Sequence, residues 1–216
     1  MFRRPATLAL TSLVVLTAAC SNEDPARTEA ASLGKVATPP ECANHPLLPA
    51  MPTAQTIAGH ALTSIECEAF SITMTYGEEG ASAEILLIDS KVPPPKDAGP
   101  LTELLVGTQQ MAFNSVVAAV GMTKGVRQMT LDTPGAVERI GGPDYLPVVM
   151  DGPTGEAFVI GVEPKDAGGG VGPLMSVLKG RYALTVLIEQ EGVSGAAAAL
   201  STHQPYLAAT NLKALP

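Results

Sequence analysis

The chain has 216 residues, 13 of them basic and 21 acidic, which gives a formal net charge of −8. An acidic chain is repelled by nucleic acid and by anionic lipid, which argues against a phosphate-reading role. The sequence contains no tryptophan and only 4% aromatic residues, which also argues against an aromatic platform for carbohydrate. The length suits one or two modest domains.

The amino-terminal residues have the pattern of an export signal. Arg3 and Arg4 supply positive charge, and residues 6–16 (ATLALTSLVVL) form an apolar run without charge. This run is shorter than the roughly 20 residues that cross a bilayer and matches the about 7–15 apolar residues of a signal peptide. We therefore expect export rather than a membrane-spanning helix.

The segment that follows, residues 16–20 (LTAAC), resembles the lipobox of bacterial lipoproteins, with Thr17 where that family most often has Leu. The resemblance implies that residues 1–19 are removed and that Cys20 carries acyl chains, which together form a durable bilayer anchor. Because Ser21 rather than Asp follows the cysteine, it also implies, for a Gram-negative host, sorting to the outer membrane, facing the periplasm. The alternative is an ordinary secretory signal that leaves Cys20 as a free thiol.

After the predicted signal, a polar segment precedes a segment whose composition is typical of a folded domain. Residues 20–40 are polar, small and proline-ended, and they predict a lipidated, flexible tether. We expect residues 41–216 to form a single α+β domain, with a pattern that hints at two similar halves.

The remaining cysteines form an even pair. With Cys20 assigned to lipid, Cys42 and Cys67 are predicted to form a disulfide in an oxidising compartment. This bridge would close a loop of about 25 residues, worth roughly 3.5 kcal/mol in the chain-entropy model. The alternative is a zinc or copper site that adds His45 and His60, although their spacing fits no compact knuckle. The sequence otherwise predicts no cofactor.

The first part of the domain predicts a hairpin followed by a helix. Residues 64–76 alternate with period two, with a switch of parity at 69–70 that suggests a bulge or a break, and residues 81–90 return as the second strand. A proline-rich connection, 91–100, leads to a helix predicted over 101–120 and stopped by Gly121. The residues expected on its core side are Leu101, Leu104, Leu105, Thr108, Ala112, Val116 and Ala119.

The second part predicts more strands and a final helix. A glycine-rich loop is expected at 166–173, and Ser194 is expected to cap a helical segment over about 194–213 that Pro205 breaks or kinks. The predicted strands are 126–131, 136–140, 146–150, 156–162 and 181–189. The fold class is therefore α+β: an antiparallel sheet of hairpins packed by two helical segments (about 101–120 and 194–213), with the helices on one face.

No catalytic constellation is evident. His45, His60 and His203 lie in no known motif, and Glu66 and Glu68 are expected to share a solvated strand face. The seven internal methionines are scattered along the chain and are expected to pack in the core.

Two function classes remain. The first is a membrane-anchored envelope lipoprotein with a non-enzymatic binding or accessory role, whose partner is an envelope protein, a polymer or a small molecule. The alternative is an envelope enzyme, a hydrolase or a metal-dependent enzyme, with a site assembled from His60, Glu66, Glu68 and Asp144. A histidine and a carboxylate within hydrogen-bond reach in a pocket would favour the enzyme, and an apolar patch on the sheet or helices would favour binding.

Overall fold

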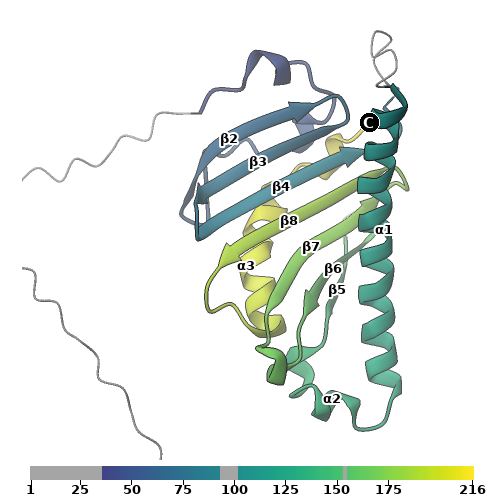
Figure 1. Ribbon diagram of the computed structural model, residues 1–216. Coiled ribbons are helices and arrows are strands. Elements are labelled where there is room, and N and C mark those ends of the chain that lie inside the picture. The colour runs from purple at the N-terminus through teal and green to yellow at the C-terminus, as the bar shows by residue number, and fades with distance from the viewer. Residues whose placement is uncertain (1–35, 93–101, 153–154) are drawn as a thin grey trace, which may run out of the picture. The chain divides into compact units, whose positions relative to one another are not determined.

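The structure, a computed structural model, describes residues 36–92, 102–152 and 155–216. They form an eight-stranded antiparallel sheet with a long helix on one face and a shorter helix on the other (Figure 1). This is the predicted α+β class. The predicted signal with Cys20, most of the tether and most of the proline-rich connection lie outside the described residues.

The first half of the chain is a meander of antiparallel strands. It consists of β1 (Thr56–Ile57), β2 (His60–Glu68), β3 (Ser71–Glu78) and β4 (Ala81–Asp89). The predicted hairpin is β3–β4. The parity switch at 69–70 is a turn that separates β2 from β3, while the register shift between these strands lies between Leu62 and Ser64.

Helix α1 (Thr102–Asp132) follows these four strands, and the rest of the chain again has four strands followed by a helix. The elements after α1 are α2 (Ala136–Arg139), β5 (Val148–Asp151), β6 (Ala157–Val162), β7 (Val171–Leu178), β8 (Tyr182–Gln190) and α3 (Gly195–Ala209). The strands expected at 146–150, 156–162 and 181–189 correspond to β5, β6 and β8.

Two predicted strands are wrong because α1 is longer than expected. The helix continues past Gly121, so the segment 126–131 is helical, and 136–140 contains α2 instead of a strand. Thr130 is buried, and Arg127 donates a hydrogen bond to the carbonyl oxygen of Pro147 (2.6 Å). These tertiary contacts favour the helix over the β-propensity of the local sequence.

Strand β7 lies partly where a glycine-rich loop was expected. The loop ends at Gly170, and β7 pairs with both β6 and β8. Gly172 and Pro173 fall where the β6–β7 register shifts, between the pairs Val162–Val171 and Ile160–Leu174. A proline cannot donate to a sheet ladder, so it is tolerated at such an irregularity.

The two halves meet in the middle of the sheet. The strand order is β1-β2-β3-β4-β8-β7-β6-β5, so β4 and β8 are neighbours, with Ile85 opposite Val186. At the end of this pair, the Arg181 guanidinium bonds both carboxylate oxygens of buried Asp89 (2.7 and 2.5 Å). The Gln109 amide of α1 donates to the Asp89 carbonyl, so this contact joins both halves to the helix.

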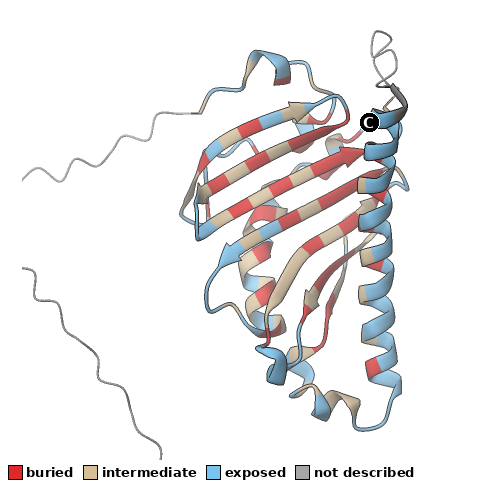
Figure 2. Ribbon diagram, viewed as in Figure 1, coloured by how far each residue is buried: buried red, intermediate tan, exposed pale blue. Residues whose placement is uncertain are grey.

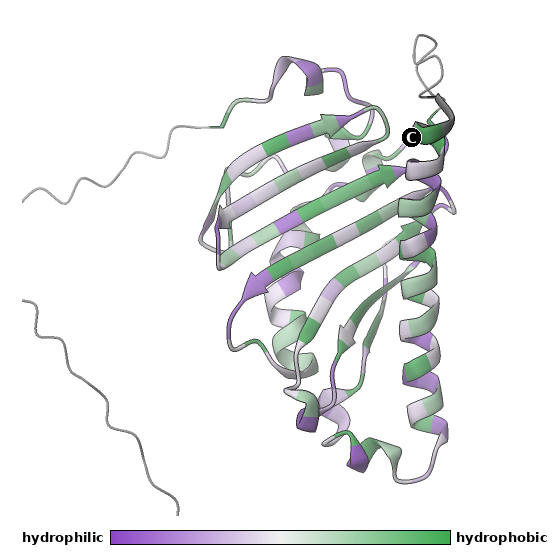
Figure 3. Ribbon diagram, in the orientation of Figure 1, coloured by the Kyte–Doolittle hydropathy of each residue, from purple (hydrophilic) through white to green (hydrophobic). Residues whose placement is uncertain are grey.

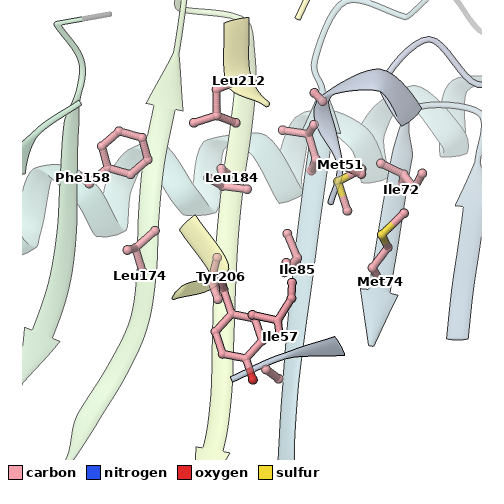
Figure 4. Packing of buried hydrophobic residues seen from close by; sticks show 14 of the residues in the cluster. Met51, Ile57, Ile72, Met74, Ile85, Phe158, Leu174, Leu184, Tyr206 and Leu212 are labelled. Atoms are coloured by element: carbon pink, nitrogen blue, oxygen red, sulfur yellow. The ribbon is translucent and has the colours of Figure 1, made fainter. Parts of the chain in front are cut away.

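The helices lie on opposite faces of the sheet, and the expectation of a single helical face is wrong. On β8, Leu184 and Val186 belong to the core beneath α3, whereas Ala183 belongs to the cluster beneath α1. The α3 face is by far the larger core, and Figure 4 shows Tyr206 among Ile57 and Ile85 there. Buried positions alternate with less buried ones along much of the central strands (Figure 2), because the α3 face of the sheet is covered more fully than the α1 face.

Helix α3 runs continuously through Pro205, so the predicted break into two pieces at this residue is absent. Ser194 occupies the N-cap position, as expected, but its side chain makes no capping hydrogen bond. The cap is supplied instead by Asp144, whose carboxylate accepts a hydrogen bond from the Ala197 N–H (3.0 Å).

Candidate interaction site

The predicted disulfide between Cys42 and Cys67 is present, with Cα atoms 5.5 Å apart. It joins β2 to residues 36–55, which we call the strap. His45 of the strap accepts the Leu47 N–H at Nδ1 (3.3 Å) and donates from Nε2 to the carbonyl oxygen of Glu68 (2.9 Å). His45 therefore fastens the strap to the end of β2.

The strap is also fastened at its beginning. The Gln55 side-chain amide accepts from the Val36 N–H (3.0 Å) and donates to the Val36 carbonyl (3.3 Å). Between the strap and the sheet lies an apolar cavity of about 550 Å³, with Leu62, Ile65 and Met74 among its lining residues. Its size is in the range of small-molecule pockets, although its polar groups are few.

The alternative metal site is not assembled. The two sulfur atoms are bonded to each other, and His60 shares a hydrogen bond of 2.6 Å between Nδ1 and the hydroxyl of Tyr206. In the part of the chain that the structure describes, no group of three or more His, Cys, Asp or Glu residues is placed to hold a metal ion.

Two neighbouring tyrosines of the core, Tyr76 and Tyr206, are held in the un-ionised form. Burial, with a further contribution from neighbouring Tyr206, raises the pKa of Tyr76 to about 12, and burial also raises the pKa of Tyr206. The rings of Tyr76 and Tyr206 meet edge to face with centroids 6.0 Å apart. Tyr206 contacts both His60 and Tyr76, so it joins α3 to β2 and β3 across the core.

His203 is the most buried histidine. It is 2% exposed, and its Nδ1 donates to the carbonyl of Ala199 one turn earlier in α3 (2.8 Å). Its Nε2 is buried without a hydrogen-bond partner among the described residues. Burial lowers the pKa of His203, since desolvation disfavours the charged imidazolium, and the hydrogen bond to Ala199 opposes this only in part.

The residues proposed for the enzymatic alternative lie in separate places. Glu66 and Glu68 are exposed, as expected, and line a groove of about 230 Å³ that also touches Thr108 and Ala112 of α1. His60 lies at the other face, against α3, and Asp144 caps α3. Within the described ranges, no histidine hydrogen-bonds a carboxylate.

The most distinctive surface is the side of α1 that points away from the sheet. Among the described residues, nine large apolar side chains are exposed, and only Leu187 lies outside α1. The eight on α1 are Leu104, Val106, Met111, Val117, Met122, Val126, Met129 and Leu131. Figure 2 shows most of this helix exposed, and Figure 3 shows hydrophobic segments recurring along it.

Spacings of three and four residues align many of the exposed positions into one stripe. We call it the outer stripe. It consists of Leu104, Gly107, Thr108, Met111, Asn114, Ser115, Ala118, Gly121, Met122, Gly125, Val126 and Met129, all exposed.

Two residues of this stripe lie on the opposite side of the helix from the one that their spacing predicts. Leu104 and Thr108, expected to face the sheet, are exposed. Val116, also expected there, is buried, and the other buried residues on this side are Gln109, Phe113 and Val120. Three of the methionines expected in the core, Met111, Met122 and Met129, are about two-thirds exposed. Their spacing of 11 and 7 positions places them on one side of a helix, but it does not indicate whether that side is buried.

Polar groups on and beside the outer stripe are already satisfied by the helix itself. The hydroxyls of Thr108, Ser115, Thr123 and Thr130 each donate to the carbonyl four residues earlier, at 2.8–3.0 Å. The Gln110 side chain donates to Asn114 (2.9 Å). Covering these hydroxyls would therefore leave few donors without a partner.

Comparisons of the chain with protein-family models, curated proteins and solved structures gave no match. Of the helices in the described ranges, none combines the length and the apolar character needed to cross a bilayer. The case for function therefore depends on the residues themselves.

Proposed function

We propose that the chain is a membrane-anchored envelope lipoprotein with a non-enzymatic role, which binds a protein partner through the outer stripe of α1. The pattern of residues 1–20 supports acylation of Cys20, on the periplasmic side of an outer membrane. Several acyl chains on one residue hold a protein stably at a bilayer, at about 0.8 kcal/mol for each buried methylene.

The observation that carries the binding role is the distribution of exposed apolar side chains. Isolated apolar residues on a protein surface are normal, but a continuous patch marks an interaction site. Eight of the nine exposed large apolar residues of the described chain lie on one helix, and five of these eight belong to the outer stripe: Leu104, Met111, Met122, Val126 and Met129. An apolar patch on a helix favours a binding role over an enzymatic one.

The anchor is tested by changing Cys20 to Ser in the full-length chain expressed in its host. Cells are fed labelled palmitate, and we expect label on the natural chain and none on the variant, which also keeps its leader. Equal labelling of the two chains would contradict the anchor.

The binding role is tested with a photo-crosslinking amino acid at position 122 of the full-length chain in intact cells. The matched control places the same group at position 204, which is exposed on α3 at the opposite face of the sheet. We expect a light-dependent protein adduct from position 122 and none from 204. No adduct from position 122, or identical adducts from both positions, would contradict a protein partner at the outer stripe.

A further inference from the structure

The outer stripe combines exposure with a lack of charge. The sequence contains no charged residue between Glu103 and Lys124, although the chain as a whole carries a net charge of −8. Two acidic copies of the chain repel each other over most approaches. They can meet along this stripe without bringing like charges together.

Three glycines inside α1 are not explained by the fold of one copy. Gly107, Gly121 and Gly125 are interior helical positions, where glycine is less favourable than alanine. A Cβ atom added at any of them would meet nothing within 4 Å, and none has the positive φ angle that requires glycine. Glycine at such positions allows another backbone or side chain to approach closely.

We propose that the partner at the outer stripe is a second copy of the chain, bound through an antiparallel α1–α1 contact with the two-fold axis beside Ala118. This inference deepens the proposed function and rests on it. In such a pair, position i of one copy lies opposite position 236 − i of the other, so Ala118 meets its own counterpart.

The side-chain sizes in the stripe match across this axis. Met111 lies opposite Gly125 of the second copy, and Met129 lies opposite Gly107. The exposed fraction of each methionine is about two-thirds, and each glycine leaves open space in the single copy. A large side chain therefore meets a gap at both ends, with two small alanines at the centre, as close helix packing requires.

The same features are less suited to a bilayer surface. Helices that lie on membranes combine an apolar face with lysine and arginine along the polar face, which attract anionic lipid. Helix α1 has two basic residues, Lys124 and Arg127, and Arg127 is hydrogen-bonded to the carbonyl of Pro147. A membrane contact would also leave unexplained why Gly107 and Gly125 occupy interior helical positions.

The area of the proposed α1–α1 contact determines how tightly two copies are expected to associate. Gly107 and Met129 are 22 positions apart, roughly 33 Å along the helix, and a helix is about 10 Å wide. The contact would bury on the order of 300–500 Å² per copy by these helix dimensions, below the roughly 800 Å² per partner of a standard stable interface. We expect weak association in dilute solution, and tethering at a common membrane would raise the effective concentration.

The register is tested by cysteine crosslinking of the full-length chain in intact cells. Ala118→Cys places two thiols beside the axis, and oxidation with copper phenanthroline is expected to convert most of the chain to a covalent dimer. Met129→Cys is the matched control, because its two copies would be roughly 33 Å apart by the helical rise. Co-expression of M129C with G107C is expected to restore the crosslink.

A covalent dimer formed by M129C alone would overturn the antiparallel arrangement. The arrangement would also be overturned if A118C formed no more covalent dimer than the natural chain does. A second variant separates association from folding. Gly125→Leu fills the space opposite Met111 and has a better helix former, so we expect a raised urea midpoint together with loss of the A118C crosslink. An unchanged crosslink in the G125L background would contradict the proposed packing.

Failure of this inference is distinguishable from failure of the proposed function. If photo-crosslinking at position 122 yields an adduct with the mass of two copies, both stand. If the adduct contains a different protein, the second-copy inference fails and the binding role stands. If position 122 yields no protein adduct, both fail.

Discussion

Helices α1 and α3 cover opposite faces of one sheet, but they differ in how much of each helix is buried against it. Helix α3 has 15 residues, of which Ala199, His203 and Tyr206 are almost fully buried in the larger core. Helix α1 has 31 residues and contributes Phe113, Val116 and Val120 to a small cluster. Packing therefore explains most of α3, whereas it leaves the outer stripe of α1 unexplained. The difference separates residues that hold the fold from residues that are free to bind.

The largest effect is expected from the α3 side of this comparison. Tyr206→Ala should lower the free energy of unfolding by about 3–5 kcal/mol, as for other large buried aromatic residues. The side chain is 1% exposed, lies edge to face with Tyr76 and hydrogen-bonds His60. Urea denaturation of the two chains measures the loss.

The matched control is Tyr206→Phe, which keeps the ring and removes only the hydroxyl. We expect a loss of about 1 kcal/mol for that hydrogen bond. If alanine and phenylalanine destabilised the chain equally, the hydrogen bond rather than the packing would hold α3.

On the α1 side, Phe113→Ala is expected to cost less, about 2 kcal/mol, at the low end for a large core side chain. Phe113 belongs to a cluster of only seven buried residues and is 9% exposed, so the site can relax toward solvent. The same urea experiment applies. A cost equal to that of Tyr206→Ala would show that the two faces contribute alike.

Much of the central sheet could be predicted from the sequence, because strands buried on one side alternate in a way that the local residues reveal. The β3–β4 hairpin and β8 are examples. The disulfide followed from the number of cysteines and the expected compartment. The strands are predicted from the order of neighbouring residues and the disulfide from the number of cysteines. Neither prediction requires knowledge of contacts between distant parts of the chain.

The exposed side of α1 could not be predicted in the same way. Apolar residues occur on more than one side of this helix, so helical spacing allows more than one buried stripe. Only the contacts with the sheet decide that Gln109 is buried and Leu104 exposed. The bond between His60 and Tyr206 joins residues 146 positions apart, and no local pattern indicates it.

The next prediction concerns pH and belongs to α3. Burial lowers the pKa of His203 in the folded chain, while the unfolded value is about 6.5. Below pH 6.5 the unfolded state therefore binds a proton that the folded state does not, and the free energy of unfolding falls as the pH falls toward the folded pKa. The slope from one such histidine is at most about 1.4 kcal/mol per pH unit.

Replacing His203 with Leu should remove this contribution, since the variant has no group to protonate and no buried Nε2 without a partner. The measurement is urea denaturation of both chains at several pH values between 7.5 and 5.5. We expect the stability of the natural chain to decline relative to the variant as the pH is lowered. Parallel curves would show that His203 is protonated equally in both states.

The smallest effect on stability is expected at the outer stripe itself. Met122→Gln exchanges two side chains of similar length and helix propensity at a position that is 66% exposed, so the free energy of unfolding should change by less than about 0.5 kcal/mol. The matched control is Met74→Gln, at a position that is 3% exposed, where an amide buried without partners should cost about 2 kcal/mol or more. The same chemical change thus tests both environments. A polar amide in the stripe should nonetheless reduce the A118C crosslink. The amide binds water, and this water would have to be removed when the second copy binds. If Met122→Gln destabilised the single chain as much as Met74→Gln, the stripe would belong to the fold, and its exposure would no longer support a partner.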